Sequence, residues 1–452
     1  GSEPMPEVVI RGGVVVDARG ARRADVAIED ATIVAVEPEI DATGTGATVL
    51  DAAGCTVAPG LVDLHTHLRE PGREEAETVA SGSACAARGG FSAIVAMPNT
   101  DPAIDCAAVV HQVLRAGRAA GRCEVLTSAA ITLGREGEQL APMGELADLG
   151  VRLFTDDGAG VQDDRLMRRA MEYASDLGVV LAQHCEVEAL AEGGHMHEGS
   201  VSSRLGIPGI PAEAEDLMVA RDLALARRVG VPVHFQHLST AGSVELVRAA
   251  KGAGQPATAE DTTHHFTLTD ECCGSYDPVF KVNPPLRPAT DVEAIRDGLA
   301  DGTIDAIATD HAPQPSEAKE LPFDQAPPGM LGLETAFALA WTELGGPEGL
   351  LGIEDLLALL SWRPARIARA TRHGRPVVVG EPANLCVVDL EHRWVIERDA
   401  TASRSRNNPY AGRSVQGAVR HTVYEGHPTV VDGSLGEPRP APTTPTRSES
   451  AS

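Results

Sequence analysis

The sequence predicts an α/β protein whose central part is a (β/α)8 barrel. Apolar strand-like runs alternate with amphipathic helical runs over about 300 residues. Short β-like runs punctuated by Gly and Asp occupy both flanks of this region. Such alternation indicates parallel strands joined by right-handed crossovers. A chain of 452 residues, 43% of them hydrophobic, can bury a core of that size.

The predicted elements follow the chain in order. Short β runs fill residues 7–58, and a similar β-rich region returns at 377–432. The segment 436–452 is rich in Pro, Thr and Ser and poor in apolar residues, so we expect it to be flexible. Between the two flanks we expect strands at 92–97, 151–155, 179–184, 233–238 and 304–309, and helices at 164–177, 213–229 and 291–300.

Charge and cysteine content argue against several functions. The formal net charge of −27 makes binding to nucleic acid or to an anionic membrane surface unexpected. The eight cysteines form no Cys-x-x-Cys pair, which predicts reduced thiols and a cytoplasmic location. The sequence has neither the pattern of a signal peptide nor an apolar run long enough to span a bilayer.

Histidine and aspartate follow several predicted strands at the point where each strand ends. His65 and His67 close an apolar run, and alternation along a strand turns both toward one face. His184, His237 and Asp310 end three further strands. Because the carboxyl ends of barrel strands meet at one face, we expect these five side chains to form a metal site.

Two histidines for each metal and a shared carboxylate would make a binuclear site, and such sites often need a bridging anion. A carbamylated lysine is excluded, because the sequence has no lysine between residues 67 and 184. The segment FTDDG (154–158) supplies two carboxylates at a strand end, and on this argument either Asp156 or Asp157 could bridge the metals.

The motifs of the chain resemble those of class I dihydroorotases, which belong to the amidohydrolase superfamily. The resemblance covers roughly residues 8–435 and implies a distorted (β/α)8 barrel at 59–375 with a small β-sandwich domain built from 6–58 and 376–435. The motifs are VDLHTHLREPG (62–72), AMPNTDP (96–102), FTDDGAGVQ (154–162), QHCE (183–186), HEGSVSSRLGIPGIP (197–211), VNPPLRP (282–288) and IATDHAP (307–313).

The resemblance also implies the metal ligands and the reaction. It selects Asp157 over Asp156 as the bridging residue, and it implies two divalent ions, with zinc the expected metal. The expected reaction is the reversible opening of a cyclic amide by metal-activated water, with Asp310 as the general base. The implied ligands are His65, His67, Asp157, His184, His237 and Asp310.

The implied substrate is a small molecule that carries a ring carboxylate. The planar guanidinium of Arg69 suits bidentate binding of that carboxylate. Asn99 matches a family residue that binds the same group, and Asn283 and the backbone at Pro328 and Gly329 match positions that hold the ring. The implied substrate contacts are His67, Arg69, Asn99, Asn283, Gln314, Pro328 and Gly329.

Two positions depart from the family pattern. Gln314 replaces the histidine that ends the family motif DHAPH, and a glutamine amide donates a hydrogen bond but carries no charge. Asp261 and Thr263 replace an apolar residue and a proline, and we expect the adjacent His264 and His265 to pack rather than to bind metal.

These departures leave two alternatives to a dihydroorotase. One is another cyclic amidohydrolase, such as an allantoinase-like or hydantoinase-like enzyme or a secondary-pathway relative. The other is a non-catalytic, dihydroorotase-like partner of aspartate carbamoyltransferase, although such a chain has no reason to keep a full metal set. A homodimer and an association with aspartate carbamoyltransferase both stay open.

Overall fold

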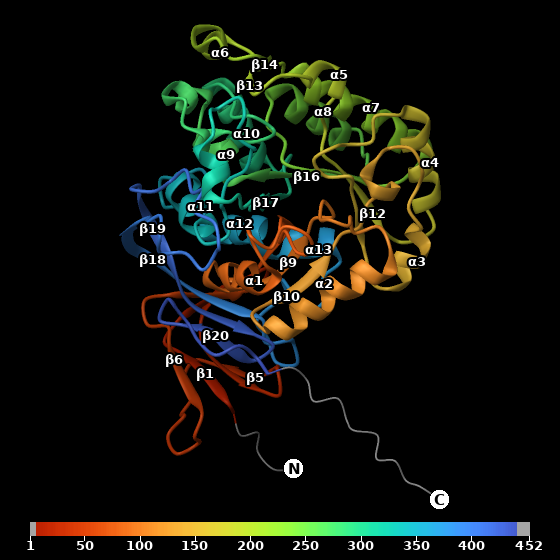
Figure 1. Cartoon of the computed structure of the whole chain (residues 1–452). Coiled ribbons are helices and arrows are strands. Elements are labelled where there is room, and N and C mark those ends of the chain that lie inside the picture. Colours follow the sequence, from red (N-terminus) through yellow and green to blue (C-terminus); the bar gives the residue numbers. More distant parts are fainter. Residues whose placement is uncertain (1–5, 441–452) are drawn as a thin grey trace, which may run out of the picture.

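Two parallel sheets form the centre of the computed structural model, which describes residues 6–440 (Figure 1). Most of their strands are buried on both faces, as is typical of parallel sheets covered by helices. The three-stranded sheet has the order β10-β9-β8 and the five-stranded sheet the order β11-β12-β15-β16-β17. The bounds are β8 (Leu61–Thr66), β9 (Phe91–Ala96), β10 (Glu124–Thr127), β11 (Leu153–Phe154), β12 (Val180–Gln183), β15 (Val233–Phe235), β16 (Ala257–Thr262) and β17 (Ala306–Ala308).

The two sheets are joined at both edges. A parallel bridge pairs Ala129, just after β10, with Phe154 of β11. A second parallel bridge pairs Thr66 of β8 with His311, just after β17. The α/β class with parallel strands is therefore confirmed, and the strands predicted from the sequence coincide with β9, β11, β12, β15 and β17 to within a few residues.

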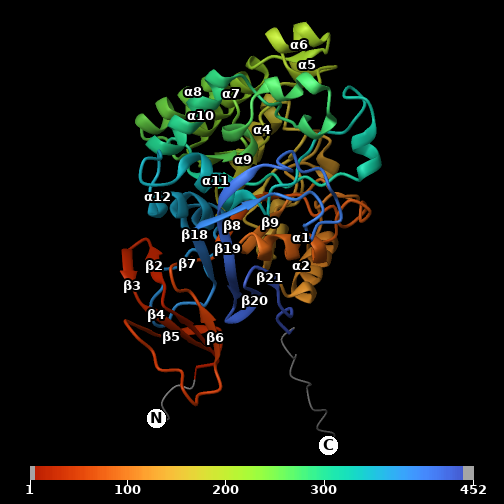
Figure 2. The ribbon, with the colours of Figure 1, turned by 90° about the vertical axis from the view of Figure 1, so that its left-hand side faces the viewer.

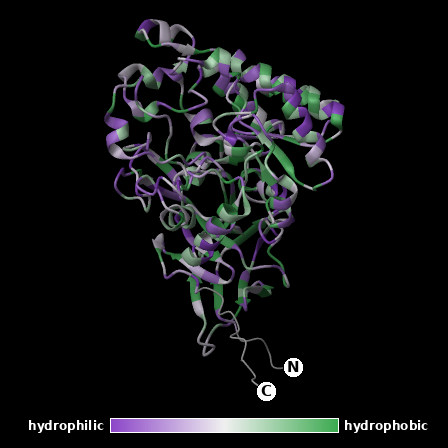
Figure 3. Cartoon of the chain, turned by 45° about the vertical axis from the view of Figure 1, so that its right-hand side comes forward, coloured by the Kyte–Doolittle hydropathy of each residue, from purple (hydrophilic) through white to green (hydrophobic). Residues whose placement is uncertain are grey.

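Helices cover the outer side of the parallel strands. Figure 1 shows α4, α7, α8 and α10 outside and β12, β16 and β17 nearer the middle. Figure 3 shows both hydrophobic and hydrophilic residues along these outer helices, as expected for elements that bury one face. The bounds are α1 (Val79–Arg88), α2 (Ala107–Ala120), α3 (Met143–Asp148), α4 (Asp164–Ala174), α7 (Glu213–Val229), α8 (Ala241–Gly252), α10 (Ala289–Asp301), α11 (Ala336–Leu344), α12 (Ile353–Leu357) and α13 (Arg363–Ala368).

Local sequence sets where these helices begin and end. The Thr240 side chain accepts a hydrogen bond from the backbone N–H of Ser243 and so caps the start of α8. Gly230 ends α7 in the left-handed region at φ 81°, which a glycine adopts without strain. The predicted helix 213–229 coincides with α7, whereas the predicted helix 164–177 ends earlier, at Ala174.

Smaller elements lie in the connections. They are α5 (Glu188–Ala191), β13 (Met196–His197), α6 (Ser200–Leu205), β14 (Gly209–Ile210), α9 (Thr263–Thr267), the 3₁₀ turns Leu133–Arg135, Asp270–Ser275, Pro278–Phe280 and Ser316–Glu320, and a π-helical turn at Ala358–Trp362. In the described residues, no helix is long and apolar enough to cross a bilayer.

Two further sheets are built from the flanks of the chain. Both flanks contribute to the larger sheet, whereas the smaller one comes from the N-terminal flank alone and lies at the lower end of the view in Figure 2. A seven-stranded sheet has the order β21-β20-β19-β18-β7-β2-β3, and a four-stranded sheet has the order β5-β4-β1-β6. The bounds are β1 (Val8–Arg11), β2 (Val14–Asp17), β3 (Gly20–Arg23), β4 (Asp25–Glu29), β5 (Thr32–Glu37), β6 (Thr48–Asp51), β7 (Thr56–Pro59), β18 (Leu385–Val395), β19 (Ser414–Tyr424), β20 (His427–Val431) and β21 (Ser434–Leu435).

The pairing of β7 with β18 joins the two flanks. It is antiparallel and sets Pro59 opposite Leu385. Side chains from both sheets, among them Ile10 and Val387, form one buried cluster. Beyond it, Arg439 donates its backbone N–H to the carbonyl of Gly121, so the start of the segment expected to be flexible is hydrogen-bonded. The rest of that segment, 441–452, lies outside the described residues.

Candidate active site

The six side chains expected to bind metal lie together at the carboxyl ends of the parallel strands. His65 is in β8 with His67 just beyond it, and Asp157, His184, His237 and Asp310 follow β11, β12, β15 and β17. All six are buried. His237 and Asp310 adopt positive φ values of 30° and 45°, a strained conformation that clusters at functional sites.

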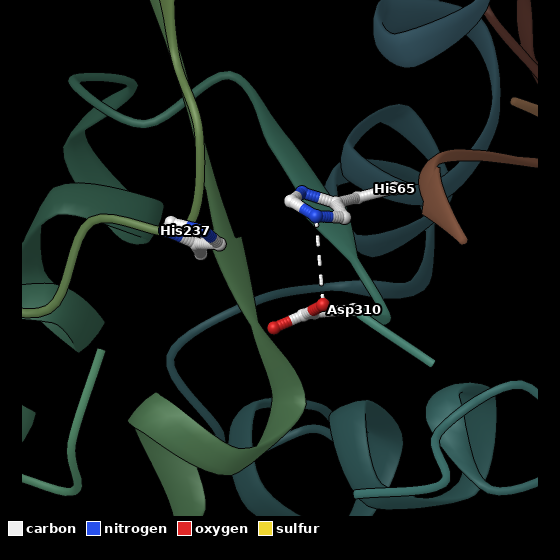
Figure 4. Close-up of side chains that lie close together, drawn as sticks. All are labelled: His65, His237 and Asp310. Carbon is white, nitrogen blue, oxygen red and sulfur yellow. Dashed lines mark ion pairs between the residues drawn. The ribbon is translucent and has the colours of Figure 1, made fainter. Parts of the chain in front are cut away.

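Short distances connect these side chains. Asp310 Oδ1 lies 3.0 Å from His67 Nε2 and 3.4 Å from His65 Nε2. Asp157 Oδ1 lies 3.3 Å from His65 Nε2 and 3.6 Å from both His184 Nδ1 and His237 Nε2. Figure 4 shows the His65 ring directed at the Asp310 carboxylate, with His237 across from them.

Three overlapping groups of these side chains could each hold a cation, because their ligand atoms lie within 4.8 Å of one another. Asp157 belongs to two of the groups, whereas the neighbouring Asp156 faces away. Asp156 Oδ1 accepts backbone hydrogen bonds from Ile131 and Thr132 at 2.8 and 3.0 Å. The groups are His65, His67 and Asp157; Asp157, His184 and His237; and His65, His237 and Asp310.

The unpaired atoms of the cluster fit a bound cation. His65 Nε2, His237 Nδ1 and Asp157 Oδ1 are buried and have no hydrogen-bond partner among the described residues. Buried polar atoms without partners are costly, and a divalent cation would satisfy them. Burial alone would raise the pKa of Asp157, but the positive charge of the surrounding histidines holds it well below its ordinary value. Imidazole and carboxylate ligands suit zinc.

Glu260, which sequence reasoning missed, is a buried carboxylate that is hydrogen-bonded to a histidine of the cluster. Glu260 in β16 lies 2.7 Å from His65 Nδ1 and 3.0 Å from His234 Nε2. A histidine that donates Nδ1–H to a carboxylate keeps its Nε2 lone pair available for a metal. Glu260 could have been found from the sequence, because it lies in a buried strand next to the strand of His237. A glutamate in such a strand is rarely buried without a partner.

A cavity of about 280 Å³ opens beside the cluster, and every residue expected to contact the substrate lines it. Asn99 Oδ1 accepts a hydrogen bond of 2.8 Å from His67 Nδ1, which leaves the Asn99 amide hydrogens available. Arg69 donates from Nε to the carbonyl of Pro313 at 3.1 Å. The lining includes His67, Arg69, Arg73, Asn99, Asn283, Asp310, Gln314, Pro328 and Gly329.

Gln314 forms part of the cavity wall through contacts with its neighbours. Its amide nitrogen donates to the carbonyl of Pro328 at 2.8 Å, and its Oε1 accepts from Arg73 Nη2 at 3.0 Å. Arg73 was not among the residues expected from the sequence. We expected His264 and His265 to pack rather than to bind metal. His265 is buried, and its two ring nitrogens are hydrogen-bonded to Thr262 and to the carbonyl of Pro284.

The chain is similar to known proteins over most of its length. Residues 54–243 match a family model described as dihydro-orotase-like. A dihydroorotase of Streptomyces coelicolor is 49% identical over 433 residues, which cover 95% of this chain and all of the relative. A dihydroorotase of Mycobacterium tuberculosis is 46% identical, covering 91% of this chain and 96% of the relative.

Solved structures share the fold. An L-hydantoinase from Arthrobacter aurescens superposes with a TM-score of 0.84 at 23% identity and covers 96% of this chain and 98% of its own. At that level of identity the likeness concerns the fold alone. The near full-length relatives decide the family: this chain belongs to the dihydroorotases of the amidohydrolase superfamily.

Proposed function

We propose that the protein catalyses the reversible interconversion of L-dihydroorotate and N-carbamoyl-L-aspartate, a step of pyrimidine synthesis. The observation that carries this proposal is the buried cluster of four histidines and two aspartates beside a cavity that two arginines line. The relatives named dihydroorotase, which match nearly the whole chain, support the same reaction.

The proposed cofactor is a pair of divalent ions, with zinc preferred. His65, His67, Asp157, His184, His237 and Asp310 would hold them. When bound, such a pair lowers the pKa of water and polarises a carbonyl group. The unpaired nitrogen and oxygen atoms of the cluster support this assignment.

A side chain of the protein would transfer the proton during the reaction. Asp310 would take the proton of the attacking water and return it to the ring nitrogen when the amide bond breaks. Asp310 lines the cavity, and its Oδ1 atom lies 3.0 Å from His67 Nε2. Because the same carboxylate accepts and returns the proton, it serves both directions of the reaction.

The cavity walls would bind the substrate. The Arg69 guanidinium would pair with the ring carboxylate, and the free amide hydrogens of Asn99 would bond to the same group. Asn283 and the backbone at Pro328 and Gly329 would hold the ring against His67, and Gln314 would close the wall on the far side. A carboxylated ring is favoured over a neutral one because arginine side chains line the cavity.

We also infer that the eight parallel strands close into a distorted (β/α)8 barrel over residues 59–375. The parallel bridges at both sheet edges support this closure. Residues 6–58 and 376–435 would form one composite β-sandwich domain, which the mixed sheet and its shared core support. A cytoplasmic location, a homodimer and an association with aspartate carbamoyltransferase stay predictions.

Turnover of L-dihydroorotate by the zinc-loaded protein tests the proposal. Loss of the ring is followed by ultraviolet absorbance, and cyclisation of N-carbamoyl-L-aspartate is followed at lower pH. Hydantoin, allantoin and dihydrouracil serve as comparison rings without the carboxylate. We expect turnover of the carboxylated ring in both directions. No turnover by protein that holds about two metal ions per chain, or preference for a ring without a carboxylate, would overturn the proposal.

A further inference from the structure

We propose that Arg73 is a specificity-determining residue that binds the substrate carboxylate together with Arg69, and that Gln314 positions it. The inference rests on the proposed function, because it assigns the group that recognises the same substrate. It also accounts for the replacement of the family histidine at position 314: the positive charge that this histidine would contribute comes here from a neighbouring side chain.

The position of Arg73 supports a role in the cavity. Arg73 lines the same cavity as Arg69 and Asp310. Its backbone N–H donates to the carbonyl of Arg69 at 2.9 Å, so the two arginines are one turn apart on a single loop. Gly72 fixes this loop against its neighbour, because a Cβ atom there would lie 2.2 Å from the carbonyl oxygen of Asp101.

The charge of Arg73 remains available for an anion. The ion pair of Arg73 with Glu75 spans 3.9 Å between Nε and Oε1, beyond hydrogen-bond distance, and both side chains are well exposed. Exposed ion pairs of this kind contribute little to stability, so Glu75 does not hold the Arg73 side chain in place. A guanidinium has five N–H donors, and one of those of Arg73 is bonded to Gln314. Most of its N–H donors are therefore left for a carboxylate.

Gln314 suits this arrangement better than a charged residue would. Its Oε1 accepts from Arg73 Nη2 at 3.0 Å, whereas a protonated histidine has no acceptor to offer. The amide nitrogen donates to Pro328, and the backbone N–H donates to Asn407 Oδ1 at 3.2 Å. Asn407 in turn donates to the carbonyls of Ala312 and Gly329. Gln314 is therefore held by Pro328 and Asn407, and it orients the guanidinium of Arg73.

The test compares Arg73→Met with Arg73→Lys and with the double variant Arg73→Met/Gln314→His. We expect Arg73→Met to raise the KM for L-dihydroorotate about 10- to 100-fold, the effect of losing hydrogen bonds to a charged group, with kcat changed much less. Arg73→Lys should have a KM between those of Arg73→Met and the unmodified enzyme, because lysine keeps the positive charge but not the planar pair of N–H donors. The double variant should recover at least tenfold, because a histidine returns a charged donor to the cavity.

Equilibrium binding gives a readout that does not depend on turnover. Calorimetry with orotate, a planar ring that carries the same carboxylate, should show the same loss of affinity in Arg73→Met. Arg168→Met is the matched control, because Arg168 is an exposed arginine of α4 that pairs with Glu172 and does not line the cavity. Metal content and thermal midpoint should stay unchanged in every variant.

The outcomes separate this inference from the proposed function. No turnover of L-dihydroorotate by the unmodified enzyme overturns the proposed function, and orotate binding then still tests Arg73. Equal orotate affinity in Arg73→Met and the unmodified enzyme overturns the role of Arg73, and so does absence of orotate binding to the unmodified enzyme. A fall in kcat with lost metal, rather than a rise in KM, would assign Arg73 a purely structural role.

Discussion

Replacing Glu260 with glutamine should weaken metal binding without any change in a proposed ligand. The carboxylate of Glu260 holds two imidazoles at once, with Oε1 at 2.7 Å from His65 and Oε2 at 3.0 Å from His234. These two bonds, together with the histidine charges, outweigh burial and lower the pKa of Glu260 to about 2. Glu260 is therefore an anion that fixes which nitrogen of His65 carries the proton.

The expected size of the effect follows from the two hydrogen bonds. A glutamine offers one acceptor oxygen, so in Glu260→Gln one of the two imidazoles loses its acceptor and faces an N–H donor instead. A hydrogen bond to a charged group contributes about 1.5–3 kcal/mol. Since 1.4 kcal/mol is a factor of ten, zinc affinity should fall about 10- to 100-fold.

Competition with a chromophoric chelator measures the zinc affinity directly. The matched control is Asp261→Asn, which changes the adjacent carboxylate of the same strand, a group without a hydrogen bond to any histidine of the cluster in the described residues. That control should bind zinc as the unmodified protein does. Zinc affinity unchanged in Glu260→Gln, or lowered equally in both variants, would refute the reasoning.

Three further predictions concern the proton shuttle, the metals and the chain ends. Asp310→Asn should lower kcat by about 10²–10⁴, the usual value of general acid–base catalysis, while calorimetry shows orotate affinity within a fewfold of the unmodified enzyme; a retained kcat would exclude Asp310 as the base. Dialysis against a chelator should abolish turnover and zinc should restore it, with about two ions per chain by metal analysis; full activity without metal would contradict this. Asp17 is buried, which raises its pKa, but bonds from Arg22 and from the backbone of Val377 outweigh burial and lower its pKa. The contribution of Asp17 to the free energy of unfolding is therefore complete above 3.8, the pKa of an unfolded aspartate, and is lost as the pH falls below that value. In metal-free protein, the free energy of unfolding should exceed that of Asp17→Asn by about 1.5–3 kcal/mol at neutral pH, and urea titrations should show the difference shrinking below pH 3.8; a difference that grows in acid would reverse this assignment.

The sequence predicted much of the site because strand ends are a local pattern. Alternation sets His65 and His67 on one face, and the ends of parallel strands meet at one edge, so five side chains were expected together and lie together. The choice between Asp156 and Asp157 could not be made from the residues alone. It depends on which carboxylate the backbone of Ile131 and Thr132 engages, a contact between segments far apart in the sequence.

Other features depended on distant pairings. Glu260 reaches His65 across 195 residues, and Arg73 reaches Gln314 across 241 residues, so no periodic pattern contains either contact. The fold shows the same limit. Gly230 marked the end of α7, but nothing local marked the pairing of β7 with β18 or the parallel pairing of β1 with β6.

The shared sheet has a consequence for synthesis on the ribosome. Pro59 ends β7, and its contact Cys386 in β18 lies 327 residues further along the chain. At about 5–20 residues per second, roughly 15–65 s pass before β18 leaves the ribosome. Until then the edge of β7 that pairs with β18 has no partner. A nascent chain of this protein therefore presents this unpaired strand edge to chaperones during most of its translation, and a stop codon before β18 would leave the edge exposed permanently.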